Sequence, residues 1–383
     1  MLPFGYAVRN LFRDPTRLIQ AVVGSALVVL MVMAAAAINA GMTSLLAASG
    51  SEHNVLLIGA GSEESILRSE IPERAAGIAE ASLAGLQTVA GRRAVSPEIH
   101  QMTLIGTDAD DTRQAFVRGV TPSALLVHDR VTVTEGEFLS PGRMMVGRLA
   151  WRRLGMPREA LEPGAEVFVE DMRMTVAGVF AAPGTVMESE VWMDLNDLRS
   201  LSLRENLSSV VVRLANGEFA DVDLFTKQRL DLELSAVRES DYFERIAAFY
   251  APVRGMTWIT AILIATGALL GGINTLYAAF AGRVREIATL QAIGYGRGAV
   301  MFSLLQESTT VSLLGTLLAS LIAVSLLDGF AVSFSIGSFA LRVTPGVAFT
   351  GLCCGLLLGI VGAIPPGLRC LLPPLPDALR SSG

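Results

Sequence analysis

The chain has 383 residues, of which 51% are hydrophobic and 17% charged, and its formal net charge is −6. With its positive mean hydropathy, this composition is too apolar for an ordinary soluble protein and predicts membrane-spanning segments. The single lysine, Lys227, has no glycine near it, which excludes the G-x-x-x-x-G-K-[ST] loop that cradles nucleotide phosphates. If the protein uses ATP, another chain hydrolyses it.

The first apolar segment carries no charge from Leu18 to Ser51. Residues 18–40 alone supply the roughly 20 residues that a transmembrane helix needs. A basic start, an apolar run and the small residues "AAAAINA" also fit a signal peptide, which is the alternative interpretation. We favour a permanent helix because the apolar run is longer than the about 7–15 residues typical of such a peptide.

Residues 41–253 form one large hydrophilic insert. They hold 31 of the 36 acidic residues and 20 of the 30 basic residues, so the insert is near −11 and the rest of the chain near +5. An insert of about 210 residues can bury its own core, as one domain or as two subdomains. Its acidity argues against a nucleic-acid partner.

The insert combines strand and helix patterns. "NVLLIG" at residues 54–59 predicts a buried strand, and "IPERAAGIAEASLAGLQTV" after it predicts a helix broken by glycines. Short strands with Gly and Pro turns are predicted in "RVTVTEGEFL", "GAEVFVEDMRMTVAGVFAAPG" and "LSSVVVRLANG". We therefore expect a large α+β extracytoplasmic domain.

The insert returns to the membrane through "SDYFERIAAFYAPVRGMTW". Phe243, Ile246, Tyr250 and Val253 follow the 3-4 spacing of a helix seam, which predicts a stalk helix. Its expected partner is an extension of the first helix through Met42, Leu45 and Leu46. The alternative is an amphipathic helix lying on its own domain, and Pro252 would kink either version.

Three further apolar segments follow the insert. Residues 255–282, 308–327 and 343–368 carry no charge, which predicts transmembrane helices at about 256–280, 303–327 and 345–364. The fold class is thus four transmembrane helices with the α+β domain inserted between helices 1 and 2. Residues 254–383 form the second membrane part, and residues 365–383 form a tail.

The distribution of arginines predicts the orientation. Eight of them flank the spans on one side, against a single Arg342 in the short loop between helices 3 and 4. The positive-inside bias therefore places both termini in the cytoplasm and residues 41–253 outside. The eight are Arg9, Arg13, Arg17, Arg283, Arg285, Arg297, Arg369 and Arg380.

The cytoplasmic loop at residues 283–298, "RVREIATLQAIGYGRG", is too apolar for a mere connector. Ile287, Leu290 and Ile293 share one side of a short helix, for which Gly294 would supply the C-terminal cap. Glu307 lies near a membrane-buried position. A carboxylate there is either functional or paired, or else it lies at the interface where water reaches it.

Catalytic constellations are scarce. His53, His100 and His128 show no metal-ligand spacing, and the cysteines form no redox pair. No G-x-S-x-G elbow is present. We therefore predict no catalytic residue and no metal site, and a membrane-anchored enzyme is the least supported class.

The stretch "GRVREIATLQAIGYGRGAVMFSLLQESTTVSLLG" resembles the core signature of the FtsX/MacB-like ABC transporter permeases. That signature opens with R-x-x-E-I-x-x-x-x-A-I-G, and a glutamate follows thirteen residues after the glycine. Here the matching residues are Arg283, Glu286, Ile287, Ala292, Ile293, Gly294 and Glu307.

Other parts of the chain are similar to the same family. Residues 1–17 resemble its amphipathic N-terminal helix, and the insert from "MMVGRLAWRRLGM" onward resembles a MacB-type core domain. The tail resembles the family's closing motif, but it carries leucine or proline where the family repeats arginine. The tail residues in register are Pro366, Arg369, Ala378, Leu379 and Arg380.

The resemblance implies a role for the loop and a set of partners. The loop would be a coupling helix on a separate ABC ATP-binding subunit, with Arg283, Arg285 and Glu286 as polar contacts and Ile287, Leu290 and Ile293 as apolar ones. ATP and Mg²⁺ would bind that partner, and this chain would hold no cofactor. A second permease copy, identical or paralogous, and the lipid of the inner membrane would be further partners, with a periplasmic adaptor as an option.

Two functions stay open at this point. The first is a permease of the mechanotransmission type, which exports or extracts a lipid, lipoprotein, peptide or drug-like substrate. The second is an FtsX-like regulator that activates an extracytoplasmic partner such as a cell-wall hydrolase. The size of the insert resembles the MacB and lipoprotein-releasing branches, which favours the first.

Overall fold

The structure, a computed structural model, describes residues 4–108, 111–334 and 337–372. It divides into two compact units. The membrane unit comprises Met1–Gly41, Pro252–Phe330 and Ala340–Gly383, and the core unit comprises Met42–Ala251 and Ala331–Phe339. Each unit is described below by itself.

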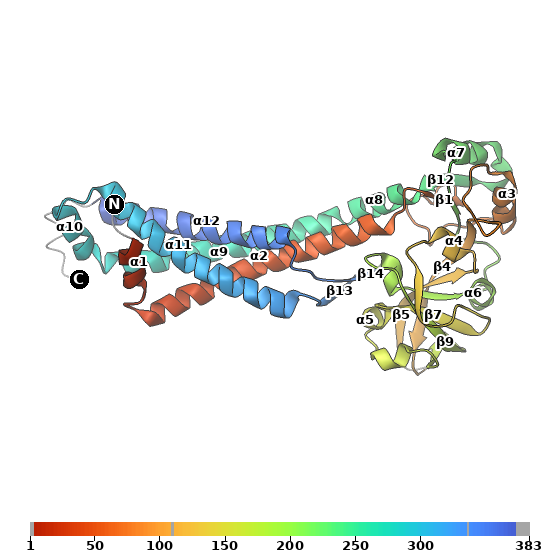
Figure 1. Cartoon of the computed structure of the whole chain (residues 1–383), viewed down its shortest axis with the longest axis horizontal. Coiled ribbons are helices and arrows are strands. Elements are labelled where there is room, and N and C mark those ends of the chain that lie inside the picture. The colour runs from red at the N-terminus through yellow and green to blue at the C-terminus, as the bar shows by residue number, and fades with distance from the viewer. Residues whose placement is uncertain (1–3, 109–110, 335–336, 373–383) are drawn as a thin grey trace. The chain divides into compact units, whose positions relative to one another are not determined.

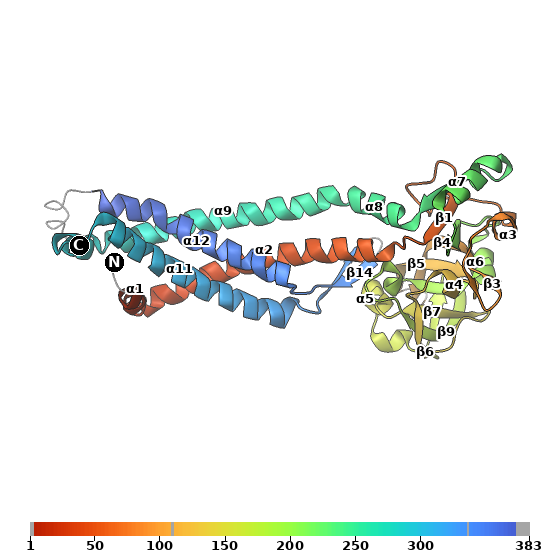
Figure 2. The same cartoon turned by 45° about the horizontal axis from the view of Figure 1, so that its top comes forward.

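Four helices of the described chain are long and apolar enough to cross a membrane, which confirms the predicted fold class. In both views of the molecule they run alongside one another (Figures 1 and 2). A turn of π-helix at Ala323–Leu327 extends the third of them. The four are α2 (Pro15–Ser49), α9 (Ala251–Ala281), α11 (Arg297–Ile322) and α12 (Pro345–Leu371).

Several helix boundaries differ from those expected; α2, for example, continues to Ser49 and α11 begins at Arg297. The N-terminal helix, α1, covers only Phe4–Leu11, and α2 begins at Pro15. Proline is favoured in the first turn of a helix, and the Asp14 carboxylate accepts hydrogen bonds from Thr16 and from the backbone of Arg17. These two features start the new helix before residue 18.

Another difference is at the end of α12, which continues through Pro365 and Pro366 to Leu371. A proline removes one backbone donor, but apolar surroundings offer the backbone no water as an alternative partner, so the helix persists. The segment expected to start the tail is therefore helical. Ala378, Leu379 and Arg380 lie outside the described residues.

Glycines bring the membrane helices close together. A Cβ atom on Gly355 of α12 would lie 1.9 Å from Thr316 Oγ1 of α11, and one on Gly315 of α11 would lie 1.9 Å from Ser25 Oγ of α2. Small residues allow such approach, on which packing depends where the hydrophobic effect does not drive helices together.

The described part of the core unit is built on a ten-stranded sheet with the order β12-β1-β11-β4-β5-β10-β7-β9-β6, to which β8 adds by pairing with β4 and β9. The β5–β10 and β7–β9 pairs are parallel. The strands are β1 (Asn54–Gly59), β4 (Val95–Gly106), β5 (Thr112–Val120), β6 (Thr132–Gly136), β7 (Arg143–Gly147), β8 (Glu166–Val169), β9 (Met172–Ala181), β10 (Val191–Asp194), β11 (Ser209–Arg213) and β12 (Leu234–Arg238).

The long strand β4 joins the two halves of the sheet. Its residues 95–98 pair with β11, and its residues 99–106 pair with β5. Because one strand serves both halves, the insert forms a single unit. Short helices flank the sheet: α3 (Arg74–Ser82), α4 (Ala124–Val127), α5 (Ala150–Leu154), α6 (Leu195–Ser202), α7 (Phe219–Gln228) and α8 (Glu239–Phe249).

Four predicted segments of the insert form strands as expected. β1, β6, β9 and β11 lie in the segments that showed strand patterns, with β8 beside β9. The predicted helix ends at Ser82, before Gly85 with its φ of +69° and a two-stranded ribbon of β2 (Thr88–Val89) and β3 (Arg92–Arg93).

A hairpin lies between the last two membrane helices, and its residues 331–339 belong to the core unit. It consists of β13 (Ala331–Phe334) and β14 (Gly337–Ala340). The amide of Ser338 donates to Ser189 Oγ at 3.1 Å, and a Cβ on Gly337 would lie 3.3 Å from Val186 and 3.4 Å from Leu45. The sequence analysis missed this hairpin, whose strands are only four residues long.

Candidate functional site

The loop between α9 and α11 folds into the short helix α10 (Val284–Ala292), as predicted. Figure 1 shows α10 at the end of the four membrane helices, near α1. Arg283 precedes its first turn, which carries Arg285 and Glu286, and Gly294 follows its C-terminal end. These two ends and the sides of the helix between them define the candidate site.

Arg283 is the centre of the polar contacts in the loop. Its Nη1 donates to both carboxylate oxygens of Glu307 at 3.1 Å, and its Nε donates to Glu286 at 3.2 Å. Glu307 also accepts a hydrogen bond of 2.9 Å from Asn10 of α1, and Arg13 forms an ion pair with Glu286. One cluster therefore ties α10 to both α1 and α11.

The electrostatics of this cluster favour the charged states. Burial, the largest single effect, raises the pKa of Glu286, but hydrogen bonds from Arg13 and Arg283 outweigh it and hold the pKa below its usual value. Burial acts to lower the pKa of Arg283. The neighbouring carboxylates of Glu307 and Glu286 outweigh burial, so the pKa lies above its usual value. The guanidinium stays charged.

The predicted contact residues of the loop fall into two groups. Arg283 has only 17% of its side chain exposed, and Ile287 is buried with Val300 and Leu304 of α11. Leu290 packs at the edge of the same cluster. The inward group thus fastens α10 to its own chain.

The outward group faces away from the membrane helices. The predicted contact residues Arg285 and Ile293 are exposed, Ile293 by 71%, and so is Thr289, which was not predicted. These residues, rather than Arg283 or Ile287, line the face of α10 that another chain could contact.

Gly294 caps α10 as predicted. Its φ is +105°, its amide donates to Gln291 at 3.0 Å, and the amide of Tyr295 donates to Leu290 at 3.1 Å. This is the hydrogen-bond pattern of a Schellman motif, in which glycine takes the left-handed position. The motif fixes where α10 ends and where the chain turns toward α11.

Glu307, left open by the sequence, is paired. It lies in α11 with 13% of its side chain exposed, held between Asn10 and Arg283. Since a carboxylate within an apolar helix is costly, these donors account for its presence there. Neither Asn10 nor Arg13 was predicted as part of the site.

The stalk residues lie in α8 and at the start of α9. Phe243 is buried, Ile246 and Tyr250 are partly buried, and Val253 is 51% exposed. The ring of Tyr250 meets that of Phe334 in the β13–β14 hairpin edge to face at 5.5 Å. α8 ends at Phe249 and α9 begins at Ala251, so the helix breaks just before Pro252.

A second cluster of charges, which the sequence did not indicate, is buried in the core unit. Arg118 of β5 holds Glu190 with two hydrogen bonds of 2.8 Å and Glu98 with one of 2.7 Å. His128 lies 2.7 Å and His100 3.3 Å from the oxygens of Glu98. Two of the three histidines are therefore partners of one carboxylate.

The pKa values in this cluster follow from burial and from Arg118. Burial acts to raise the pKa of Glu98, but His128 and Arg118 outweigh it, so the pKa lies well below its usual value. Burial, aided by Arg118, lowers the pKa of His100. No group of three or more His, Cys, Asp or Glu side chains in the described residues could hold a metal ion.

Comparisons with known proteins place these features in a family. The family model described as "MacB-like periplasmic core domain" matches residues 21–223, and the one described as "FtsX-like permease C-terminal" matches residues 258–371. The chain is thus a multi-pass membrane protein with an inserted core domain. It belongs to the FtsX/MacB-like family of ABC transporter permeases.

Two solved structures are similar to parts of the chain. The periplasmic region of MacB from Actinobacillus actinomycetemcomitans is 10% identical with a TM-score of 0.39, over 52% of this chain and 94% of that one. The extracellular domain of the noncanonic ABC-type transporter YknZ from Gram-positive bacteria is 11% identical with a TM-score of 0.37, over 48% of this chain and 99% of that one. No curated protein matches the chain.

Proposed function

We propose that this chain is the membrane subunit of an ABC transporter of the mechanotransmission type. ATP hydrolysis by a separate subunit moves α10, and the permease passes that motion to its extracytoplasmic domain. The observation that carries the proposal is the division of α10 into an inward face held by Arg283 and Ile287 and an outward face bearing Arg285 and Ile293.

The inward face suits transmission of force. Arg283 connects α10 with α11 through Glu307, which also accepts a hydrogen bond from Asn10 of α1. Glu286 pairs with Arg13 in the turn between α1 and α2. Because these contacts bridge three helices, a displacement of α10 changes contacts on α1 and α11 as well. Motion can bias a distant part only through such differences in contact.

The outward face suits a partner protein. The ATP-binding subunit would contact Arg285 and Ile293, and it would hold ATP and Mg²⁺, while the permease contributes no catalytic residue. A second permease copy would complete the membrane part. The orientation that fits is α1 and α10 in the cytoplasm and residues 41–253 outside the inner membrane, as the arginine distribution indicates.

The expected substrate is a lipid, lipoprotein, peptide or drug-like molecule acted on at the outer side. Support comes from the membership of the chain in the family and from its large core domain, matched over residues 21–223. In this mode the substrate need not cross the interior of the helix bundle. The domain works as a moving part that ATP hydrolysis drives from a distance.

Co-purification tests the proposal. The tagged permease is isolated from gently solubilised membranes, and the ATPase activity that accompanies it is measured. We expect the double variant Arg285→Ala/Ile293→Ser to lose the ATP-hydrolysing subunit, because both changes lie on the outward face of α10. The control Arg9→Ala removes an exposed arginine from α1 and should retain the subunit.

Two results would contradict the proposal. One is a wild-type permease that carries no ATP-hydrolysing subunit in any gentle detergent. The other is a double variant that retains the subunit at the wild-type level. In that second case the partner surface lies elsewhere than on the outward face of α10.

A further inference from the structure

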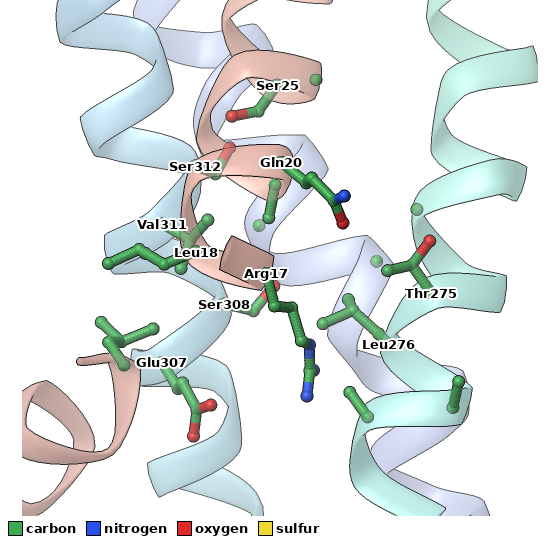
Figure 3. Close-up of a pocket in the computed structure, with 18 of the residues that line it drawn as sticks. Arg17, Leu18, Gln20, Ser25, Thr275, Leu276, Glu307, Ser308, Val311 and Ser312 are labelled. Carbon is green, nitrogen blue, oxygen red and sulfur yellow. The ribbon is translucent and has the colours of Figure 1, made fainter. Parts of the chain in front are cut away.

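A cavity of about 690 Å³ opens inside the membrane unit, beside the first turns of α2. Residues of α1, α2, α9, α11 and α12 line it, and Figure 3 shows the side chains that enter it. Its volume lies within the range of about 300–1,000 Å³ that is usual for small-molecule sites. Its lining includes Arg283, Glu286 and Glu307 of the coupling cluster, but the coupling mechanism proposed above assigns no ligand to the space between the helices.

The cavity is amphiphilic. One end is charged, with Arg13, Asp14, Arg17, Arg283, Glu286 and Glu307 in its lining. The other end is apolar, and its lining includes Val28, Leu269 and Leu358. A ligand that fills both ends must have a polar head and a hydrocarbon tail.

Most charges at the polar end already have partners. Glu307 accepts from Asn10 and Arg283, and Glu286 accepts from Arg283 and pairs with Arg13. The Asp14 carboxylate is occupied by Thr16 and the backbone of Arg17. The acids of the cavity are therefore satisfied within the chain.

Arg17 differs from the other two arginines. In the residues that the structure describes, its guanidinium makes no hydrogen bond and no ion pair, although Glu307 attracts it at longer range and Arg283 repels it. Figure 3 shows its side chain extending into the cavity between Glu307 and Leu276. A guanidinium that is partly buried in an apolar helix bundle without an acceptor is costly, and the planar fork matches a phosphate.

The depth of the cavity matches one leaflet of a bilayer. Arg17 and Val28 both line it, and they are separated along α2 by roughly 16 Å at 1.5 Å per residue. That length is about half of the roughly 30 Å of hydrocarbon in a membrane. Gln20, Gly24 and Thr275 are exposed as well as part of the lining, so the cavity is open to its surroundings at this level.

We propose that the membrane unit binds one anionic phospholipid in this cavity, with the phosphate on Arg17 and an acyl chain along the apolar wall. The lipid enters from the leaflet that adjoins α1 and α10. It completes the hydrogen bonding of Arg17 and fills the space between α2 and α9. The proposal is independent of whether α10 contacts an ATPase.

Lipid retention tests the proposal. The full-length permease is reconstituted in nanodiscs of phosphatidylglycerol and phosphatidylcholine in equal amounts, extracted gently, and analysed by native mass spectrometry for bound lipid. The wild type should retain phosphatidylglycerol in preference to phosphatidylcholine. Arg17→Gln should retain about tenfold less, which corresponds to the loss of about one hydrogen bond to a charged group.

Two further variants separate the site from general effects. Gly24→Leu places a side chain into the opening while Arg17 stays, and a Cβ at Gly24 meets no atom within 4 Å, so the fold should tolerate it. It should also lose the lipid. Arg297→Gln removes an exposed arginine at the start of α11, outside the lining, and should retain it.

Three outcomes would overturn the proposal. Equal retention by Arg17→Gln and wild type would show that the phosphate is not held there. Competition by millimolar inorganic phosphate, with no loss in Gly24→Leu, would assign the site to a free anion. A change in oligomeric state by Arg17→Gln with unchanged lipid would assign the cavity to a second copy of the chain.

Discussion

Arg118 lies between two buried carboxylates, Glu98 and Glu190, and neutralises both only in part. Trp192 adds a hydrogen bond of 3.1 Å to Glu190, and the two histidines lie beside Glu98. A buried ion network of this kind is weak evidence for stability, but removing one member leaves uncompensated charge in the interior. The network therefore fixes which residues must be present together.

Replacing Arg118 should show this dependence. We expect Arg118→Met to destabilise the core unit by about 3–5 kcal/mol, because two carboxylates lose their counter-ion in a buried site. Hydrogen exchange of the β4 and β5 amides in the full chain measures the loss. The control Arg173→Met breaks the exposed pair with Glu166 and should cost about 0–1 kcal/mol; equal effects would contradict the argument.

The buried carboxyl of Glu239, at the start of α8, leads us to predict that the stability of the core unit depends on pH. Burial raises the pKa of its carboxyl above the usual value, despite favourable contacts with His128, Ser51 and Asn54. A raised folded pKa contributes stability that is present below the unfolded pKa and is lost as the pH rises through the folded pKa. Ionisation of Glu239 therefore weakens the core unit as the pH increases.

The variant Glu239→Gln tests this sign. A single oxygen of Glu239 accepts from both Ser51 and Asn54, so the amide oxygen of glutamine can keep both bonds. The exchange stability of β1 in the variant, relative to wild type, should improve as the pH rises above about 4.5. Glu244→Gln, exposed on the same helix, should show no such trend. A trend of opposite sign would refute the assignment.

The end of α10 depends on one backbone conformation. Gly294 adopts a φ of +105°, which valine takes only with strain. We expect Gly294→Val to unravel the last turn of α10 and to reduce the accompanying ATPase in the co-purification assay. Gly296→Val is the matched control, because Gly296 has a φ of −63° and a Cβ there meets nothing within 4 Å. If both variants lost the accompanying ATPase to a comparable degree, the added valine side chain would be the cause rather than the backbone conformation of Gly294.

The sequence predicted the apolar elements better than the polar ones. The four spans and β1, β9 and β11 follow from runs of apolar residues that any surroundings would bury. β4 was missed because its segment "VSPEIHQMTLIG" contains Pro97, Glu98 and His100, which are unfavourable in a strand taken alone. Arg118 of the neighbouring strand β5 and His128 provide the partners that make Glu98 tolerable there.

The sequence predicted the local part of the candidate site but not its long-range contacts. Arg283, Glu286 and Gly294 stand close together in one motif, so the sequence showed the loop. Asn10 is 297 residues from Glu307, and nothing local in the chain signals that contact. The sequence also gave no means of dividing the loop residues into inward and outward groups, since that division depends on how α10 lies against α1 and α11.

The membrane unit leaves one of its helices largely uncovered. Only 6% of the most apolar window of α9 is buried within the chain. Gly267, Gly271 and Gly272 lie in this helix, and a Cβ on any of them would meet no atom within 4 Å. Small residues on a membrane helix permit close approach of another helix, so this face suits a second copy as well as lipid.

Cross-linking distinguishes the two. In a variant without the native cysteines Cys353, Cys354 and Cys370, Gly271→Cys should form a disulfide-linked dimer under mild oxidation, since a disulfide requires Cα atoms within about 7 Å. Leu317→Cys, 59% exposed on α11, is the control and should stay monomeric on a denaturing gel. Absence of a cross-link at Gly271, or equal cross-linking at both positions, would leave lipid as the occupant of this face.

The β13–β14 hairpin makes the core unit discontinuous in the chain, because residues 331–339 return to it long after residue 251. A soluble fragment made from residues 42–251 would therefore be an incomplete object: Ser189 and Tyr250 would lose their partners Ser338 and Phe334. Such a fragment resembles one part of a split protein, and a synthetic peptide with the hairpin sequence is the other part. The affinity of the fragment for this peptide would measure how strongly the hairpin binds to the rest of the core unit.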